Sequence, residues 1–156
     1  MVFNKIFSSP IEQYQYKQQN ILIVEPDRER GKILAKLIKS ERPRHRLLLI
    51  DNLEQIFSLI YGEVAIDLIF FDIEAEENTH NIALIKAIAP KITLIHWSHC
   101  QHPEIIELLY SLGINSFCIK GGDNRTIIEA MDLAGSYPQS LYLDKRLHNC
   151  LSLLGS

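Results

Sequence analysis

Short apolar runs, each followed by polar residues, recur along this chain. The runs occupy positions 21–24, 46–50, 67–71, 92–97 and 116–119. Continuous apolar segments of this length are typical of strands buried on both faces of a parallel sheet. The segments between them place apolar residues at helical spacing. The pattern therefore predicts an α/β fold, with a doubly wound, five-stranded parallel sheet and helices on both of its faces.

Capping and helix-breaking residues set the expected ends of these helices. Asp27, Asn52 and Asp123 stand just before helical patterns, where short polar side chains cap helix N-termini. The first helix should end before Pro43, because the residue preceding a proline avoids the helical conformation. Gly113 should end the helix that begins at about Pro103.

The chain divides into three expected parts. Residues 1–19 are polar and form an N-terminal extension with a short helix around residues 12–17. Residues 20–136 hold the alternating strands and helices of one domain. Residues 137–156 form a C-terminal tail with a short strand or extended segment and a helix capped by Asp144.

Composition narrows the class of protein. A formal charge of −3 over 156 residues argues against direct nucleic-acid binding, because domains that bind nucleic acid usually carry a net positive charge. Three unevenly spaced cysteines do not suit a disulfide framework and fit a reducing compartment. No secretion signal and no apolar segment of about 18 residues is present. We expect a cytoplasmic protein that does not enter a membrane.

Four polar residues follow the ends of four predicted strands. Glu25, Asp72, Ser98 and Lys120 come at or just after the runs that begin at positions 21, 67, 92 and 116. In parallel α/β sheets the ligand site lies beyond the carboxyl ends of the strands. Carboxylates, a hydroxyl and an ammonium at one edge match the chemistry of a phosphate-and-metal site.

This arrangement resembles the receiver domains of two-component response regulators over Asn20 to about Ala134. Such domains have an acidic pair after strand one, a phospho-accepting Asp after strand three, Thr or Ser after strand four and Lys after strand five. The segment 113–121 and the later Ala134-Gly135-Ser136 resemble LuxR/NarL-type receivers in particular. The resemblance implies the strand order 2-1-3-4-5.

The resemblance also implies residue roles. Asp72 would be the phospho-acceptor, with Lys120 pairing with the phosphoryl group and Ser98 bonding to it. Ser98 and Phe117 would form the switch, with Ser98 drawing Phe117 inward. The protein would not be an enzyme beyond self-catalysed phosphotransfer to Asp72. A sensor histidine kinase or another signalling protein would be its partner, and a second copy of the chain is a further candidate.

Mg²⁺ is the cofactor that the resemblance implies. Its ligands would be Glu25, Asp72 and the backbone carbonyl of Glu74, with the side chain of Asp27 as an additional candidate. Pro26 stands where the family carries its second acid, and proline offers no ligand. Two alternatives follow: a weakened metal site with phosphorylation at Asp72, or a non-phosphorylated pseudo-receiver that acts as a constitutive interaction or dimerisation module.

The sequence departs from the family pattern at further positions and offers other candidate sites. Ala75-Glu76 replaces the family's Met-Pro, and no helix-turn-helix sequence follows the domain within the chain. An output function on another chain is therefore an alternative. The residues 96–102 hold several His and one Cys, but they fall in one segment, which favours a polar loop with a partly packed Trp97 over a metal site. A basic patch at 42–46 is either a solvated surface or a docking surface. FMN binding is disfavoured, because no phosphate-binding loop follows the first strand.

Overall fold

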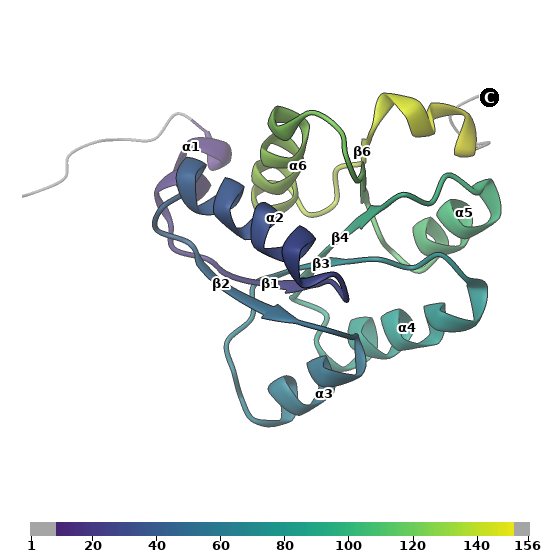
Figure 1. Cartoon of the computed structure of the whole chain (residues 1–156), viewed down its shortest axis with the longest axis horizontal. Coiled ribbons are helices and arrows are strands. Elements are labelled where there is room, and N and C mark those ends of the chain that lie inside the picture. Colours follow the sequence, from purple (N-terminus) through teal and green to yellow (C-terminus); the bar gives the residue numbers. More distant parts are fainter. Residues whose placement is uncertain (1–8, 152–156) are drawn as a thin grey trace, which may run out of the picture.

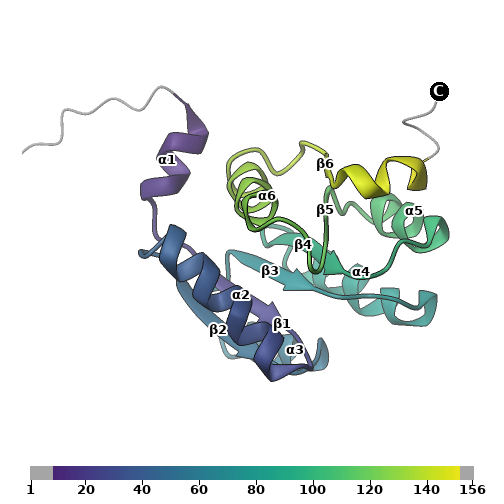
Figure 2. The same cartoon turned by 45° about the horizontal axis from the view of Figure 1, so that its top comes forward.

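The computed structural model describes residues 9–151 and gives a single parallel sheet with helices on both faces (Figures 1 and 2). Its strand order is β2-β1-β3-β4-β5-β6, and every neighbouring pair is parallel. The strands are β1 (Asn20–Val24), β2 (Arg46–Ile50), β3 (Leu68–Phe71), β4 (Thr93–Ser98), β5 (Ser116–Ile119) and β6 (Tyr142–Leu143).

Six α-helices and two 3₁₀ helices accompany these strands, with α1 before β1 and η2 after β6. The α-helices are α1 (Pro10–Tyr16), α2 (Arg28–Glu41), α3 (Glu54–Tyr61), α4 (Thr79–Ile88), α5 (Pro103–Ser111) and α6 (Asn124–Ser136), and the 3₁₀ helices are η1 (Glu76–Asn78) and η2 (Lys145–Cys150). The five predicted strands and the predicted helices between them are present, so the expected α/β class and the order of the first five strands are confirmed.

Two apolar cores lie on opposite faces of the sheet. Tyr14, Leu34 and Met131 bring α1, α2 and α6 into the core on one face. Ile56, Ile82 and Ile106 bring α3, α4 and α5 into the core on the other face. Strands β3 and β5 are buried along their full length, as continuous apolar runs predict.

The two helix-capping aspartates and the helix-ending glycine lie at the helix ends that the sequence predicts. Asp27 accepts hydrogen bonds from the backbone N–H groups of Glu29 and Arg30 at the start of α2, and Asp123 accepts one from Arg125 at the start of α6. Gly113 follows α5 with a φ of 98°, a conformation that favours glycine.

The tail contains the predicted short strand, β6, and this strand joins the sheet as a sixth member where five were predicted. Tyr142 lies opposite Ser116 and Leu143 opposite Phe117. The segment after Asp144 forms a 3₁₀ helix instead of the expected α-helix and buries Leu147 against the core that contains α5. Residues up to 151 therefore pack as part of the same fold.

His96 and Trp97 lie in the strand that the sequence predicts over residues 92–97, as the structure confirms. Strand β4 continues through both residues to Ser98, and both side chains are buried. The interpretation of residues 96–102 as a polar loop with a partly packed Trp97 is wrong at these two positions, because the ladder with β5 extends to Ser98. No helix among residues 9–151 is long and apolar enough to cross a membrane.

Candidate functional site

The carboxyl ends of four parallel strands meet at one edge of the sheet. Glu25 follows β1, Asp72 follows β3, Ser98 ends β4 and Lys120 follows β5. Because the strands are parallel and in register, these four side chains come from neighbouring positions along that edge. The predicted gathering of an acid, a hydroxyl and a lysine is present.

Lys120 is the centre of the site. Its ammonium nitrogen lies 2.7 Å from Oδ2 of Asp72 and also bonds Oε2 of Glu25. The side chain is 2 % exposed, and the ammonium sits 4.7 Å from the centroid of the Trp97 ring. A buried ammonium needs compensating partners, and here two carboxylates and an aromatic face supply them.

Both oxygens of the Glu25 carboxylate are engaged. Oε2 accepts from Lys120, and Oε1 accepts from the backbone N–H of Asp27 at 3.2 Å and from Arg30 at 3.5 Å. Glu25 thus acts as the anchor of Lys120. Arg30 is a contributor that the sequence pattern did not single out.

Asp72 differs from Glu25 in having one oxygen without a partner. Oδ2 contacts Lys120, while the buried Oδ1 has no hydrogen-bond partner. The side chain is 18 % exposed and lines a cleft of about 700 Å³. An unpaired carboxylate oxygen beside a cleft can accept a hydrogen bond or act as a nucleophile once the side chain turns it into the cleft.

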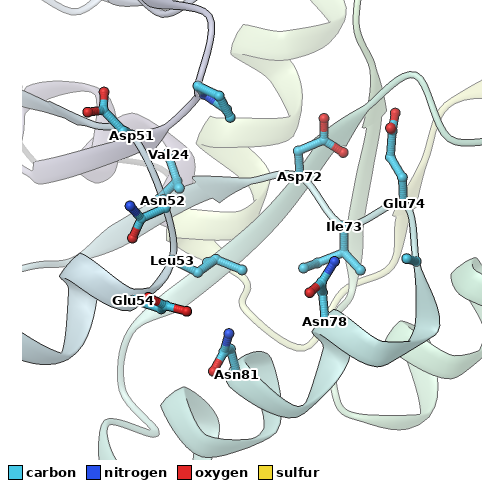
Figure 3. Close-up of a pocket in the computed structure, with 12 residues that line it drawn as sticks. Val24, Asp51, Asn52, Leu53, Glu54, Asp72, Ile73, Glu74, Asn78 and Asn81 are labelled. Carbon is cyan, nitrogen blue, oxygen red and sulfur yellow. The ribbon is translucent and has the colours of Figure 1, made fainter.

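The cleft next to Asp72 has two polar walls (Figure 3). Asp72 and Glu74 stand on one wall, and Asp51 and Asn52 stand on the other. Asn78 and Asn81, at and near the start of α4, line the floor, and Pro26 belongs to the lining as well. The loop after β2 was absent from the predicted site, because nothing in its sequence distinguishes a cleft residue from a turn residue.

Ser98 and Phe117 are both buried and do not line the cleft. Ser98 is buried, and its hydroxyl oxygen accepts a hydrogen bond from the backbone N–H of Cys100 at 2.9 Å. Its carbonyl accepts from the N–H of Lys120 at 2.9 Å, which ties the ends of β4 and β5 together. Phe117 is already fully buried in this structure.

His96 supports the acceptor loop from inside the core. Its Nε2 lies 3.2 Å from the backbone nitrogen and 3.0 Å from the carbonyl oxygen of Ile73, the residue after Asp72. The ring packs between Phe71 and Phe117, at centroid distances of 5.3 and 5.9 Å. Burial lowers the pKa of His96 to about 4, so the ring is neutral at physiological pH.

The donors present fit a magnesium ion only in part. Within residues 9–151, no three His, Cys, Asp or Glu side chains are grouped so that they could hold a metal. Glu25 is engaged by cations, and Asp27 caps α2. Of the four predicted ligand residues, Asp72 and Glu74 line the cleft, and Oδ1 of Asp72 is buried there without a hydrogen-bond partner. This set does not amount to a preformed Mg²⁺ site.

The architecture matches solved structures of response regulators. A comparison with models of protein families gives no match, and a comparison with curated protein sequences gives none either. A LuxR-family response regulator from Aurantimonas has a TM-score of 0.74 at 11% identity, with 88% of this chain and 97% of that chain covered. The isolated REC domain of RcsB from Salmonella enterica has a TM-score of 0.72 at 13% identity, over 86% and 99%. A LuxR-family DNA-binding response regulator from Silicibacter pomeroyi has 0.71 at 16%, over 81% and 98%.

This chain has the receiver-domain fold. The predicted resemblance to LuxR-type receivers is confirmed at the level of architecture. The site residues keep the status of predictions, since a shared fold does not assign chemistry. Asp72, Lys120 and Ser98 occupy the expected strand ends of the receiver fold.

Proposed function

We propose that this chain is a response-regulator-type signalling domain with Asp72 as its phosphoryl acceptor. The observation that carries the proposal is the asymmetry of the Asp72 carboxylate. Lys120 holds Oδ2 at 2.7 Å, while Oδ1 has no hydrogen-bond partner and the side chain lines an open cleft. One oxygen is fixed beside a cation, and the other is buried without a partner next to the cleft, so that a small rotation of the side chain would bring it to a phosphodonor.

The proposed reaction is an in-line transfer. Oδ1 of Asp72 attacks the phosphorus of a phosphohistidine or a small acyl phosphate, and the bond from phosphorus to the donor atom breaks. The electron pair leaves with the donor, and Asp72 becomes an acyl phosphate. The ammonium of Lys120 lies next to the acceptor and would pair with the added negative charge. Asp72 and Glu74 line the cleft and would be the protein ligands of a Mg²⁺ ion there, which would neutralise charge on the incoming phosphoryl group.

Ser98 would respond to the new charge. Its oxygen accepts from the N–H of Cys100, so its hydroxyl proton is available for donation to a phosphoryl oxygen. Donation would draw Ser98 and the loop after β4 toward Asp72. Phe117 is already inside the core, so the response would pass through the loop that follows Ser98 and not through an inward movement of Phe117. The differential contact required for switching is the Ser98–phosphoryl bond.

The second candidate is a pseudo-receiver that binds a partner without phosphorylation. Its supporting observation is Glu25, whose two carboxylate oxygens are taken up by Lys120, Arg30 and a backbone N–H. With Pro26 at the cleft, the divalent cation that assists phosphoryl transfer in many sites would have few ligands. Trp97 and Ile114 are buried, so neither can belong to an exposed docking patch.

Partners follow from the same chemistry. A phosphodonor with a phosphohistidine, such as a histidine kinase, is the partner under the first proposal, and a signalling protein that reads the surface is the partner under the second. Both proposals place the domain in the cytoplasm, and neither involves nucleic acid.

Incubation with acetyl phosphate followed by intact-mass measurement separates the two proposals. The first predicts a gain of one phosphoryl group in the wild type, and no gain in Asp72→Asn. The reaction should be run with and without Mg²⁺, because Asp72 and Glu74 are the two candidate ligands that line the cleft. Absence of any gain in the wild type under both conditions would favour the pseudo-receiver. The fluorescence of Trp97, the one tryptophan of the chain, reports the surroundings of Lys120 in parallel.

A further inference from the structure

Strand β2 forms an edge of the sheet and is unusually apolar for such a position. In the part of the chain that the structure describes, β1 is its one strand neighbour. The strand reads Arg46-Leu47-Leu48-Leu49-Ile50. Sheet edges in soluble proteins are commonly protected by lysine, proline, a bulge or a covering segment. Between Arg46 and Asp51 there is no charged residue and no proline.

The central residue of this edge is open to solvent. Leu48 is 45 % exposed, and it lines a small hollow of about 80 Å³ together with Leu22 and Ile66. The helices before and after β2 in sequence also expose large apolar side chains, Ile33 on α2 and Tyr61 at the end of α3. Figure 2 shows β2 along the outer side of the sheet, with α2 packed over it.

The outward hydrogen-bonding groups of β2 belong to Leu47 and Leu49. The N–H of Arg46 donates to Gln19, and the carbonyl of Ile50 accepts from Glu25, so positions 46, 48 and 50 face β1. Since backbone groups alternate along a strand, Leu47 and Leu49 direct their N–H and C=O groups away from the sheet.

We propose that β2 pairs antiparallel with β2 of a second copy, which makes this edge the interface of a two-fold symmetric dimer. Leu48 then lies opposite Leu48 of the partner, as a pair without mutual hydrogen bonds. Leu47 lies opposite Leu49 of the partner, and each such pair exchanges two backbone hydrogen bonds. This register uses both outward-facing residues, and it is self-complementary as a two-fold interface requires.

The charges at the two ends of β2 favour the same arrangement. Arg44 and Arg46 are exposed at the start of the strand, and Asp51 and Glu54 are exposed just beyond its end. Antiparallel pairing brings the basic end of each strand to the acidic end of its partner, whereas parallel pairing would place like charges together. The occupant that fits this edge is therefore the same edge of a second copy.

The dimer would be closed, which means that no third copy could add to the sheet. The opposite edge of the sheet is β6, which has two residues and continues directly into η2. Among the described residues, β2 is thus the edge strand long enough to pair with another copy, and in the dimer it is already paired. The interface lies at the edge farthest in strand order from β5 and does not depend on the chemistry proposed for Asp72.

Sedimentation velocity of the full chain tests the interface. We expect a dimer with a dissociation constant below about 100 μM. Leu48→Lys places two ammonium groups opposite each other at the two-fold axis and should raise the dissociation constant at least about tenfold. Leu84→Lys is the matched control, because Leu84 on α4 is exposed to a similar degree (50 %) and lies outside β2. It should leave the dimer unchanged.

Two further measurements test the register. Arg46→Asp and Asp51→Arg should each weaken the dimer, and the double variant should restore it, because the end charges are exchanged in both copies. Amide hydrogen exchange should show protection of Leu47 and Leu49 that increases with protein concentration, while Leu48 is protected at all concentrations by its bonding to β1. A monomer at about 100 μM, a dimer that Leu48→Lys does not affect, or assemblies that keep growing with concentration would overturn the proposal.

Discussion

The buried imidazole of His96 makes a specific prediction about acid stability. The ring is enclosed between Phe71 and Phe117, and its Nε2 contacts the backbone of Ile73. Burial lowers its pKa to about 4, against the partial opposing effects of the Ile73 bond and the nearby Asp72 carboxylate. The unfolded chain has the ordinary histidine pKa of about 6.5. Between these two pH values the unfolded state binds a proton that the folded state does not.

The sign and the size of the effect follow from this difference. The stabilisation is fully present above about pH 6.5 and is progressively lost as the pH falls toward about 4. The complete shift corresponds to about 3 kcal/mol, and about 2 kcal/mol of it should be lost by about pH 5. Burial also lowers the pKa of His45, so His45 adds a further loss of stability as the pH falls.

Urea unfolding of the wild type and of His96→Gln between about pH 7.5 and pH 5 isolates the contribution of His96. Glutamine keeps a polar group near Ile73 but does not titrate. Stability of the variant should fall by about 2 kcal/mol less than that of the wild type over this range. Because His45 is present in both proteins, it cancels in the comparison. Equal pH dependence in the two proteins would refute the assignment of a neutral, buried His96.

Three other changes have defined outcomes. Gly135→Ala would place a Cβ 2.1 Å from the Tyr14 ring, so the free energy of unfolding should fall by about 1–3 kcal/mol. In a Tyr14→Ala background, where the clash is absent, the same change should be neutral or stabilising. Arg42→Met removes the bidentate partner of the buried Asp132 carboxylate, so the free energy of unfolding, measured in urea, should fall by about 3 kcal/mol. A fall of less than about 1 kcal/mol would contradict the pairing. Lys120→Met should abolish or strongly reduce acetyl-phosphate labelling, and undiminished labelling of a folded variant would remove Lys120 from the proposed site.

Much of the site could be predicted because parallel strands align their carboxyl ends. The apolar run before Asp72 and the run before Lys120 place the two residues at the same edge, and their side chains are in contact in the structure. The alternation of strands and helices was sufficient for the fold class. Gly113 and Asp123 marked a helix end and a helix start correctly.

The rest of the site depends on which side chains pair with one another in the folded protein, and the order of residues along the chain does not show this. Glu25 was predicted as a metal ligand, but its oxygens bond Lys120 and Arg30, and the choice between these partners is made by rotamers in the folded state. The strand β6 was missed in the sheet count because two residues carry no usable periodicity. Leu48 was assigned to a strand buried on both faces, yet β2 lies at the edge, where an apolar run has no second neighbour.

The most direct test of the central proposal is to identify the residue that carries the phosphoryl group. After incubation with acetyl phosphate, borohydride reduction converts an aspartyl phosphate to homoserine, which peptide mass spectrometry can assign to one position. The account predicts homoserine at position 72 in the wild type and at no other aspartate. Homoserine at a different aspartate, or none at any position in a folded sample, would contradict the proposed role of Asp72.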